Sequence, residues 1–382
     1  MHADVTPLIV GLLIFVSSLI SLRLGISVAI FEIILGVIAG NSGLKTEAWM
    51  MYLANFGGIV LTFMAGTEID TRLLKEKFKE SFLIGFFSFL APFVGVFLFT
   101  RYLAGWSYKA ALIAGTAMSE TSLAVVYSVL VETDMSKTKI GKLIMAATFI
   151  TNMGTAIALS ILFIKPTLYT AVFMIISVGI IFLASKYTFM IFYHPLLKNR
   201  VIEPEIKYIF LMLLVFMYFA NVGGGQAILP AFLLGLFMSK YFKESRSTKI
   251  VKIRLRTVSY AIITPMFFIA GGMKVSLKII IAGFGLFIIL FALKQITKFL
   301  GVYFFAKKYI PEGNFYLTLL LSTGLTFGLI AILFGLNAGY ISSEQYSILT
   351  GVLIASAVIP TFIAQKWFMP VDEEDIIEEN GP

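Results

Sequence analysis

The sequence predicts an all-α polytopic membrane protein with about 13 transmembrane helices, an inverted repeat and two broken helices that cross. Three observations predict this class: long charge-free stretches, basic residues gathered in alternate loops, and internal similarity at one fixed offset. Of the 382 residues, 59% are hydrophobic and only 13% are charged. A water-soluble core does not need so much apolar surface, so the composition argues against a soluble fold.

Six stretches contain no Asp, Glu, Lys or Arg, and each is long enough to cross about 30 Å of hydrocarbon as a helix. They are residues 81–100, 143–164, 166–185, 208–239, 257–273 and 314–343. With the shorter apolar runs between charged loops they predict spans at 6–22, 26–39, 50–68, 81–102, 109–131, 143–164, 168–190, 206–222, 227–241, 257–272, 277–306, 314–336 and 345–367. The triplet at 223–225 is all glycine and is expected to separate the eighth and ninth spans.

The basic residues predict the orientation of these spans. Alternate loops with the adjoining span ends hold 22 Lys and Arg residues, the others hold 6, and the remaining two, Lys294 and Lys298, lie within the eleventh span. By the positive-inside rule, the N-terminus is expected outside and the C-terminus in the cytoplasm of a multi-pass cell-membrane protein. The net charge of +9 therefore reflects topology, and no nucleic-acid partner is expected.

Several classes of site are excluded by composition. The chain has no cysteine, so disulfides and thiolate metal sites are impossible. No cluster of His, Asp and Glu has the spacing of a metal site, and no set of Ser, His and Asp lies within the spans. We therefore expect no structural metal, no cofactor and no enzyme activity. The N-terminus lacks a basic leader region, so the first apolar run is expected to remain as a span.

An internal repeat appears when the sequence is shifted by 205 residues. Residues 63–67 (FMAGT) then align with 268–272 (FIAGG), and residues 119–121 align with 324–326. The aligned spans are seven apart, so they cross the membrane in opposite directions. Weak inverted repeats of this kind are typical of secondary transporters.

The repeat draws attention to clusters of Gly, Ser and Thr in the middle of the fifth and twelfth spans, at 115–122 and 322–328. Glycine permits unwinding, and hydroxyl groups can satisfy the freed backbone groups. We expect two broken helices that direct oxygen atoms at a small ion, with Ser119, Thr121, Thr323 and Thr326 on its path. The alternative is close helix packing through small residues.

Five segments resemble the monovalent cation:proton antiporter superfamily, in its branch of bacterial and archaeal sodium/proton exchangers. They are residues 56–70, 118–126, 298–301, 321–330 and 357–361, and they occur in the family's order. The resemblance implies a homodimer in which a core moves against a scaffold. The scaffold would comprise 1–70 and 205–275, the core 71–165 and 276–370, with a linker helix at 166–204 and a short acidic cytoplasmic tail at 371–382.

The sequence departs from this family at its transporting carboxylate, which is an Asp-Asp or Asn-Asp pair in the sixth span. The matching residues here are Thr151 and Asn152, and a register one residue later would place Met153 at the Asp. Neither register supplies a carboxylate, and an Asn side chain cannot carry the proton. The face formed by Thr148, Thr151, Asn152 and Thr155 could supply neutral ligands of a cation or hydrogen bonds between helices.

Glu120 is the only acid deep in the fifth span. A carboxylate in the middle of a membrane is costly, so it should be functional or satisfied by neighbouring groups. The functional hypothesis is that Glu120 supplies the missing titrating carboxylate. Lys298 matches the family's core lysine, and we expect it to pair with Glu120 directly or through water, while Lys294 is expected to extend towards the membrane surface.

The sequence is therefore interpreted as a secondary active transporter that exchanges a monovalent cation for H⁺ by alternating access. Na⁺ is the favoured cation, with K⁺ and Li⁺ as alternatives. Two other interpretations stay open: a degenerate or regulatory homologue that has lost exchange with its sixth-span Asp, and transport of an anion attracted by Lys298.

Overall fold

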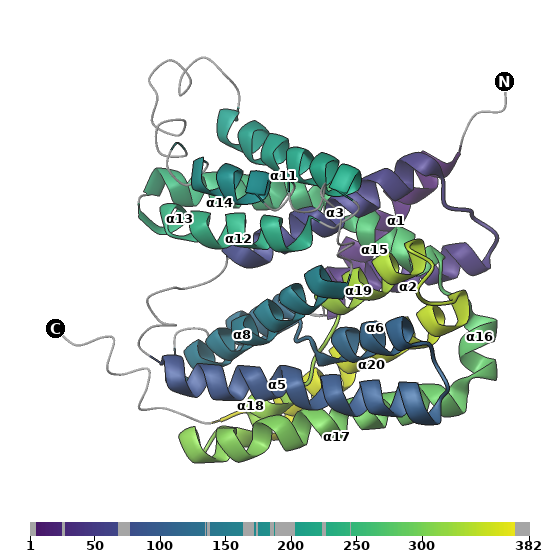
Figure 1. Cartoon of the computed structure of the whole chain (residues 1–382), viewed down its shortest axis with the longest axis vertical. Coiled ribbons are helices and arrows are strands. Elements are labelled where there is room, and N and C mark those ends of the chain that lie inside the picture. The colour runs from purple at the N-terminus through teal and green to yellow at the C-terminus, as the bar shows by residue number, and fades with distance from the viewer. Residues whose placement is uncertain are drawn as a thin grey trace. The chain divides into compact units, whose positions relative to one another are not determined.

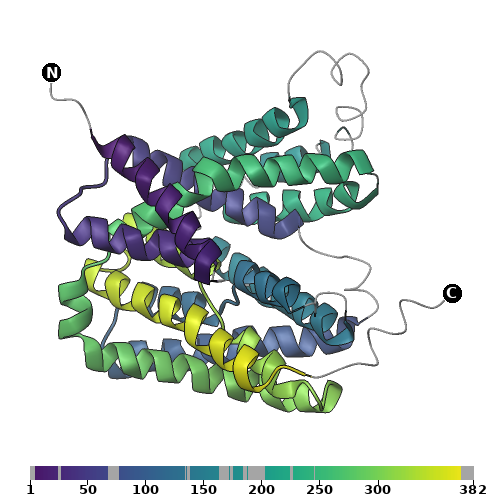
Figure 2. The same cartoon turned by 180° about the vertical axis from the view of Figure 1, so that it is seen from behind.

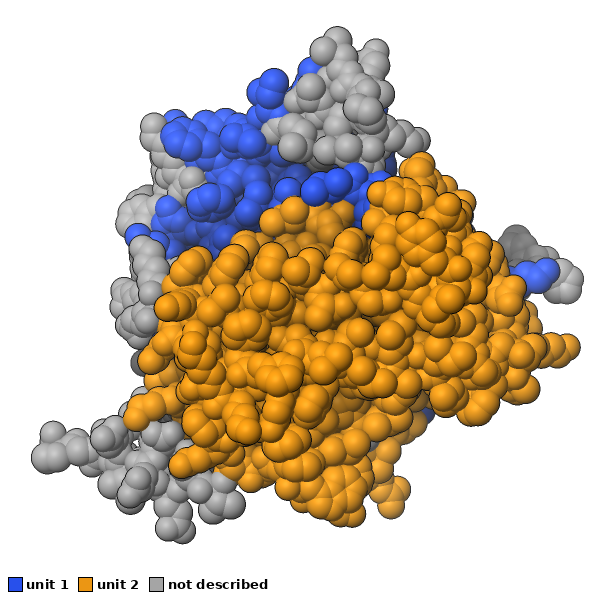
Figure 3. Space-filling view, turned by 60° about the horizontal axis from the view of Figure 1, so that its bottom comes forward, with its two compact units in different colours: residues 1–16, 45–71, 159–270 blue, residues 17–44, 72–158, 271–382 orange. Residues whose placement is uncertain are grey.

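The computed structural model describes residues 5–24, 27–67, 77–133, 135, 138–162, 172, 175–183, 187, 203–223, 227–244 and 246–370. Every regular element in these ranges is a helix. The chain divides into two compact units, which Figure 3 colours separately. Unit 1 consists of residues 1–16, 45–71 and 159–270, and unit 2 of residues 17–44, 72–158 and 271–382.

The long apolar stretches form long helices. Nine helical segments within the described ranges have the length and composition to cross a membrane. They are α1 (Thr6–Leu24), α3 (Ala48–Thr67), α5 (Phe78–Leu98) with the π-helical turn η1 (Phe99–Leu103), α8 (Lys139–Leu162), α11 (Pro204–Gly223), α14 (Arg246–Val258) with the π-helical turn η3 (Ser259–Ile263) and α15 (Thr264–Met273), α17 (Phe284–Tyr309), α18 (Asn314–Leu321) with α19 (Thr326–Asn337), and α20 (Ser343–Trp367). Their ends lie within a few residues of most predicted spans.

Shorter helices complete the described part of the chain. Two are apolar, α2 (Val28–Asn41) and α12 (Ile228–Ser239). The others are α6 (Tyr108–Ser119), α7 (Leu123–Glu132), α13 (Tyr241–Glu244) and α16 (Leu277–Ala282). The expected seventh span at 168–190 and the linker at 166–204 lie largely outside the described residues, so the count of thirteen spans stays a prediction.

The tenth span begins earlier than expected. The basic residues Lys249, Lys252 and Arg256 fall between the predicted spans at 227–241 and 257–272, but they lie on α14, which continues through η3 into α15. Lys and Arg are good helix formers, and apolar residues between them supply a buried face that includes Val251 and Leu255. The prediction of a loop from charge alone was wrong at this point.

In unit 1, helices α3 and α12 pack closely because glycines meet at their contact. A Cβ atom added at Gly66 of α3 would overlap the carbonyl oxygen of Phe232 on α12. A Cβ atom at Gly235 of α12 would likewise overlap the carbonyl oxygen of Phe63 on α3. Small residues permit such close approach of helices in a membrane, where apolar burial gives little driving force.

A similar contact lies in unit 2, between Gly272 at the end of α15 and helix α2. A Cβ atom at Gly272 of α15 would overlap the carbonyl oxygen of Ile33 on α2, and Gly36 of α2 is among its nearest neighbours. In both contacts, a glycine near the C-terminal end of one helix lies against the backbone of the other helix. The atoms it approaches there belong to a large residue, Phe232 or Ile33, and to the glycine three positions later, Gly235 or Gly36. The two contacts have the same geometry, although Gly272 lies one residue beyond Gly271, the position that the 205-residue offset aligns with Gly66.

The helices of unit 2 surround the two broken spans. Figure 1 shows α5 lying along α17, and Figure 2 shows α20, in yellow, beside α17 on the other side. Gly85 of α5 permits close contact with α8, since a Cβ atom there would lie 2.5 Å from the carbonyl oxygen of Ala147 and 2.6 Å from Cβ of Ile150. Helices α5, α8 and α17 therefore hold the groups of the site from several sides.

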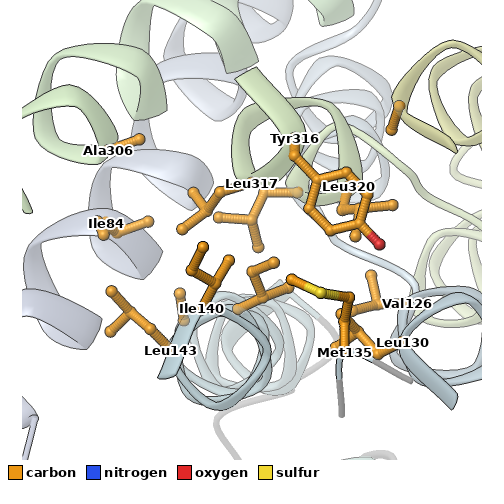
Figure 4. Close-up of a cluster of buried hydrophobic side chains, with 14 of the residues drawn as sticks. Ile84, Val126, Leu130, Met135, Ile140, Leu143, Ala306, Tyr316, Leu317 and Leu320 are labelled. Atoms are coloured by element: carbon orange, nitrogen blue, oxygen red, sulfur yellow. The ribbon is translucent and has the colours of Figure 1, made fainter. Parts of the chain in front are cut away.

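A buried apolar core in unit 2 anchors the broken helices. Figure 4 shows side chains from α7, α8 and α18 pointing towards one another, together with Ile84 of α5 and Ala306 of α17. The core includes Val126 and Leu130 of α7, Ile140 and Leu143 of α8, and Tyr316, Leu317 and Leu320 of α18. Because half of each broken helix is packed here, the interruption next to it is held in a defined position.

Candidate functional site

Two helices in unit 2 are interrupted, as the sequence predicts. Helix α6 ends at Ser119 and α7 begins at Leu123, while α18 ends at Leu321 and α19 begins at Thr326. At Glu120 the backbone is extended, with φ −67° and ψ 162°. The helix therefore stops directly before the acid, and the Gly, Ser and Thr clusters of the fifth and twelfth spans mark real breaks.

The two breaks contact each other through hydroxyl groups. Thr121 Oγ1 donates to the carbonyl oxygen of Leu321 at 2.8 Å, and the hydroxyls of Ser122 and Thr326 lie 3.4 Å apart. Ser356 of α20 donates to the carbonyl oxygen of Gly324 at 3.1 Å. These bonds satisfy carbonyl groups that the broken helices leave free, which is the role that unwound membrane helices require.

Glu120 lies in the first break and is completely buried. Neither carboxylate oxygen makes a hydrogen bond. Glu120 Oε1 lies close to Gly324, two residues before the beginning of α19. The positive end of a helix dipole thus favours negative charge at Glu120 without saturating its oxygens, which leaves them available to a cation.

Lys298 is completely buried on α17, but its partners differ from the predicted one. Its Nζ donates to Ser88 Oγ of α5 and to Thr121 Oγ1, both at 2.9 Å. No ion pair within 4.0 Å joins Lys298 to Glu120. The expected direct pair is therefore wrong, because the hydroxyl of the residue next to Glu120 accepts from the ammonium group instead. A pair through water stays a prediction.

Lys294 lies one helical turn before Lys298 and is also completely buried. We expected its side chain to extend towards the membrane surface, and this prediction was wrong, because both lysines belong to the buried face of α17. A Cβ atom at Gly324 would overlap Lys294 Nζ and lie 3.3 Å from Glu120 Oε1. The ammonium of Lys294 and the carboxylate of Glu120 therefore both lie beside Gly324, without a direct hydrogen bond or ion pair between them.

The polar face of α8 is divided between structural and unsatisfied groups. Thr151 Oγ1 donates towards the carbonyl oxygens of Gly85, at 3.1 Å, and Ala147, at 3.0 Å, and Thr155 Oγ1 donates to the carbonyl oxygen of Thr151 at 3.1 Å. By contrast, Thr148 Oγ1 and both amide atoms of Asn152 are buried without a hydrogen-bond partner. Buried polar atoms without partners are rare in folded proteins and are often explained by a ligand, water or ion.

The remaining predicted site residues support the ends of the broken helices. Ser119 Oγ donates to the carbonyl oxygen of Thr116, and Thr323 Oγ1 donates to that of Leu320, both at 2.8 Å. Thr326 begins α19 and contacts Ser122 across the breaks. The described residues contain no cluster of three His, Cys, Asp or Glu side chains suited to a tightly held metal. The oxygens offered to an ion here are those of one carboxylate, hydroxyls and backbone carbonyls.

The family described as sodium/hydrogen exchanger, transmembrane, matches residues 10–368. The chain belongs to this family. A relative named "Probable Na(+)/H(+) antiporter 3" from Methanocaldococcus jannaschii is 26% identical and covers 88% of this chain and 89% of its own length. The "Na(+)/H(+) antiporter" of Enterococcus hirae is 25% identical over 92% of this chain and 94% of its own length.

A solved structure of the sodium proton antiporter MjNhaP1 from Methanocaldococcus jannaschii has the same fold as this exchanger. It superposes with a TM-score of 0.68 over 97% of this chain and 100% of the other, at 14% identity. The polytopic all-α class and the family resemblance are thereby confirmed. The exchanger is a membrane protein of a transporter family.

Within this exchanger, sequence reasoning identified the breaks and Glu120 but missed two contributors. One is Lys294, which lies one turn from Lys298 on the same helix, a spacing that indicates a shared face. The sequence carries no signal for Ser88, since a single Ser in an apolar span is common. Its role depends on α5 lying beside α17, which no local pattern reveals.

Proposed function

We propose that Glu120 is the carboxylate on which this chain exchanges Na⁺ for H⁺ by alternating access. The observation that supports this role is that Glu120 is fully buried at the meeting point of two broken helices with no hydrogen bond to either oxygen. A carboxylate held in this way can bind one cation or one proton. Because the two compete for the same oxygens, their movements are coupled.

In this proposal some of the surrounding groups bind the cation and others position the broken helices. Hard cations prefer oxygen ligands, and the breaks and α8 offer neutral oxygens next to the negative charge. Asn152 and Thr148 have side-chain oxygens without partners and are the proposed neutral contributors from α8. Lys298, held by Ser88 and Thr121, keeps positive charge near the site and orients the first break. Ser119 and Thr323 stabilise the ends of α6 and α18, next to the proposed ion path.

Sodium-driven proton flux in proteoliposomes tests the proposed function. When an outward or inward Na⁺ gradient is imposed, protons are expected to move in the direction opposite to sodium. Internal pH, followed with a dye, should therefore rise when sodium enters the vesicles and fall when sodium leaves. The same vesicles are then given K⁺ and Li⁺ gradients, which measures cation preference. If none of the three cations changes internal pH between about pH 6 and 9, the chain is a degenerate or regulatory homologue.

Asn152→Asp is expected to change the pH dependence of exchange. The substitution places a carboxylate where the family resemblance implies one, at a buried position whose present side chain has no hydrogen-bond partner. A second carboxylate near the ion path should increase sodium affinity and shift the pH at which flux is half-maximal. Flux is measured at a series of pH values, with Asn337→Asp at the exposed end of α19 as the control. A variant that matches the parent at every pH would place residue 152 away from the path.

The division into a scaffold (1–70 and 205–275), a core (71–165 and 276–370), a linker (166–204) and a tail (371–382) is part of the proposal, as are a homodimer and an N-terminus on the outer side. The repeated glycine contacts support two related halves. Because the chain has no cysteine, single cysteines placed in successive loops can be labelled from one side to test the orientation. Light scattering in detergent measures whether the protein has the mass of two chains.

A further inference from the structure

Helix α14 carries positive charges that have no part in the proposed exchange. Its described side chains include Lys249, Lys252, Arg254 and Arg256, and its sequence contains no Asp or Glu. It belongs to the helical segment Thr248–Met273, whose 26 residues have the composition of a membrane span. A helix of this length extends about 39 Å, whereas the hydrocarbon layer is about 30 Å thick. The basic end of the segment is therefore long enough to reach the headgroup region on one side of the membrane.

Two of these bases are held by groups within unit 1. Arg254 Nη1 lies 2.7 Å from Oε1 of Glu203, the residue directly before α11. Lys252 Nζ donates to the carbonyl oxygen of Thr67, at the C-terminal end of α3, at 3.3 Å. An acid balances the first charge, and the negative end of a helix dipole favours the second. Neither base therefore needs a partner from outside the chain.

The exposed face of α14 consists of Lys249, Ile250, Ile253 and Arg256, and it combines bases with large apolar side chains. Lys249, Ile253 and Arg256 follow one another at i, i+4 and i+7, so they share one side of the helix. Ile253 is 63% exposed and Ile250 is 42% exposed. Arg256 lies over the ring of Tyr260, with 5.7 Å between its guanidinium carbon and the ring centroid. Lys249 makes no hydrogen bond or ion pair within the described residues.

This combination of side chains fits the boundary between lipid and water. Exposed isoleucines favour the acyl chains, and the long side chains of Lys and Arg extend from there to the headgroups. The exposed face contains no acid, and the nearby Glu203 is already paired with Arg254. Its positive charge therefore attracts negatively charged headgroups, whose phosphate oxygens accept hydrogen bonds from guanidinium and ammonium groups.

We propose that the exposed face of α14 binds the headgroup of an anionic phospholipid. The phosphate lies between Lys249 and Arg256, which are two helical turns apart, and the acyl chains pack against Ile250 and Ile253. Because α14 continues through η3 into α15, a lipid bound here stabilises the end of a membrane-spanning helix. Binding of this kind does not depend on ion exchange at Glu120.

Thermal unfolding in detergent micelles tests this binding. Phosphatidylglycerol added to the purified protein is expected to raise the unfolding temperature by about 3 °C or more, because a ligand that binds only the folded state stabilises it. Phosphatidylcholine with the same acyl chains is expected to give no comparable rise. In Lys249→Gln with Arg256→Gln, the rise caused by phosphatidylglycerol is expected to fall by about half or more. An undiminished rise in this double variant would overturn the proposal.

Two matched double variants act as controls. Lys249→Arg with Arg256→Lys keeps both charges and is expected to keep the rise. Lys307→Gln with Lys308→Gln removes two exposed lysines at the end of α17, where Lys308 Nζ lies 5.6 Å from the ring centroid of Tyr309, much as Arg256 lies over Tyr260. This variant is also expected to keep the rise. An equal loss here would show that the lipid responds to total charge, which would overturn the proposal.

Other occupants of the exposed face have distinct outcomes. Inorganic phosphate at the same concentration is expected to leave the unfolding temperature unchanged, and a rise equal to that with phosphatidylglycerol would assign the face to a free anion. If the double substitution of Lys249 and Arg256 halves the mass measured by light scattering, the face contacts a second copy of the chain, and the lipid assignment is overturned. Should this variant not purify as a monodisperse protein, Lys249→Gln alone is measured and is expected to reduce the rise, because its side chain has no bond within the described residues to lose.

Discussion

Glu120→Gln is expected to reduce sodium-driven proton movement to the level of empty liposomes while the protein still folds. The substitution keeps the size of the side chain and removes the one carboxylate that the described site offers between its broken helices. A neutral amide has no proton to exchange and no negative charge to attract sodium. Internal pH is followed after a sodium gradient is imposed, and monodispersity is checked by size-exclusion chromatography.

The matched control for this prediction is Glu312→Gln, which removes an exposed carboxylate between α17 and α18. It is expected to leave the flux unchanged, so that loss in Glu120→Gln cannot be attributed to net charge. If the flux in Glu120→Gln equals that of the parent protein, another residue must supply the carboxylate that binds the exchanged ion. The loss should also hold at every sodium concentration, since the variant lacks the binding charge itself.

Gly66→Ala is expected to destabilise the protein by about 1 to 3 kcal/mol through overpacking of α3 against α12. The added methyl group would overlap the carbonyl oxygen of Phe232, and backbone atoms of Gly235 and Leu236 lie next to it. These neighbours are backbone atoms of a helix, so they cannot move aside as a flexible side chain would. The two helices must separate, and the close contact that stabilises them in a membrane is lost.

Thermal unfolding in detergent measures the effect, with Gly11→Ala as the control. Gly11 lies on α1 and a Cβ atom there would meet nothing within 4 Å. At that position Ala should be neutral or stabilising, because Gly is less favourable than Ala in a helix by about 1 kcal/mol. Equal unfolding temperatures for the two variants would contradict the close contact between α3 and α12.

The two broken helices show how much of the site was predictable. Clusters of Gly, Ser and Thr in an apolar span are a local signal, and both breaks occur in those clusters. Glu120 was also identifiable, because an acid in the middle of an apolar span is rare whatever surrounds it. The pairing of lysines was not identifiable. It depends on which helices lie beside α17, and hence on the position of Ser88 and the missing side chain of Gly324.

The start of α14 illustrates the same division within the fold. The frequency of charged residues distinguishes membrane spans from loops when a span is apolar throughout. A segment rich in basic residues, however, can form either a loop or a helix. Here Val251 and Leu255 become buried only because α14 packs within unit 1, and the helix extends accordingly. Local composition cannot contain that information, since burial is supplied by residues distant in the chain.

The sequence by itself determined the helical membrane class, most span positions, the two breaks, the repeat and the family. These properties follow from hydropathy, from charge distribution and from the conformational freedom of small residues, all of which act over short stretches of chain. Only the tertiary structure decided that Lys298 contacts Ser88 and Thr121 and that Lys294 and Glu120 both lie beside Gly324. A buried charge takes the partner that packing brings within reach, and packing is set by helices far apart in sequence.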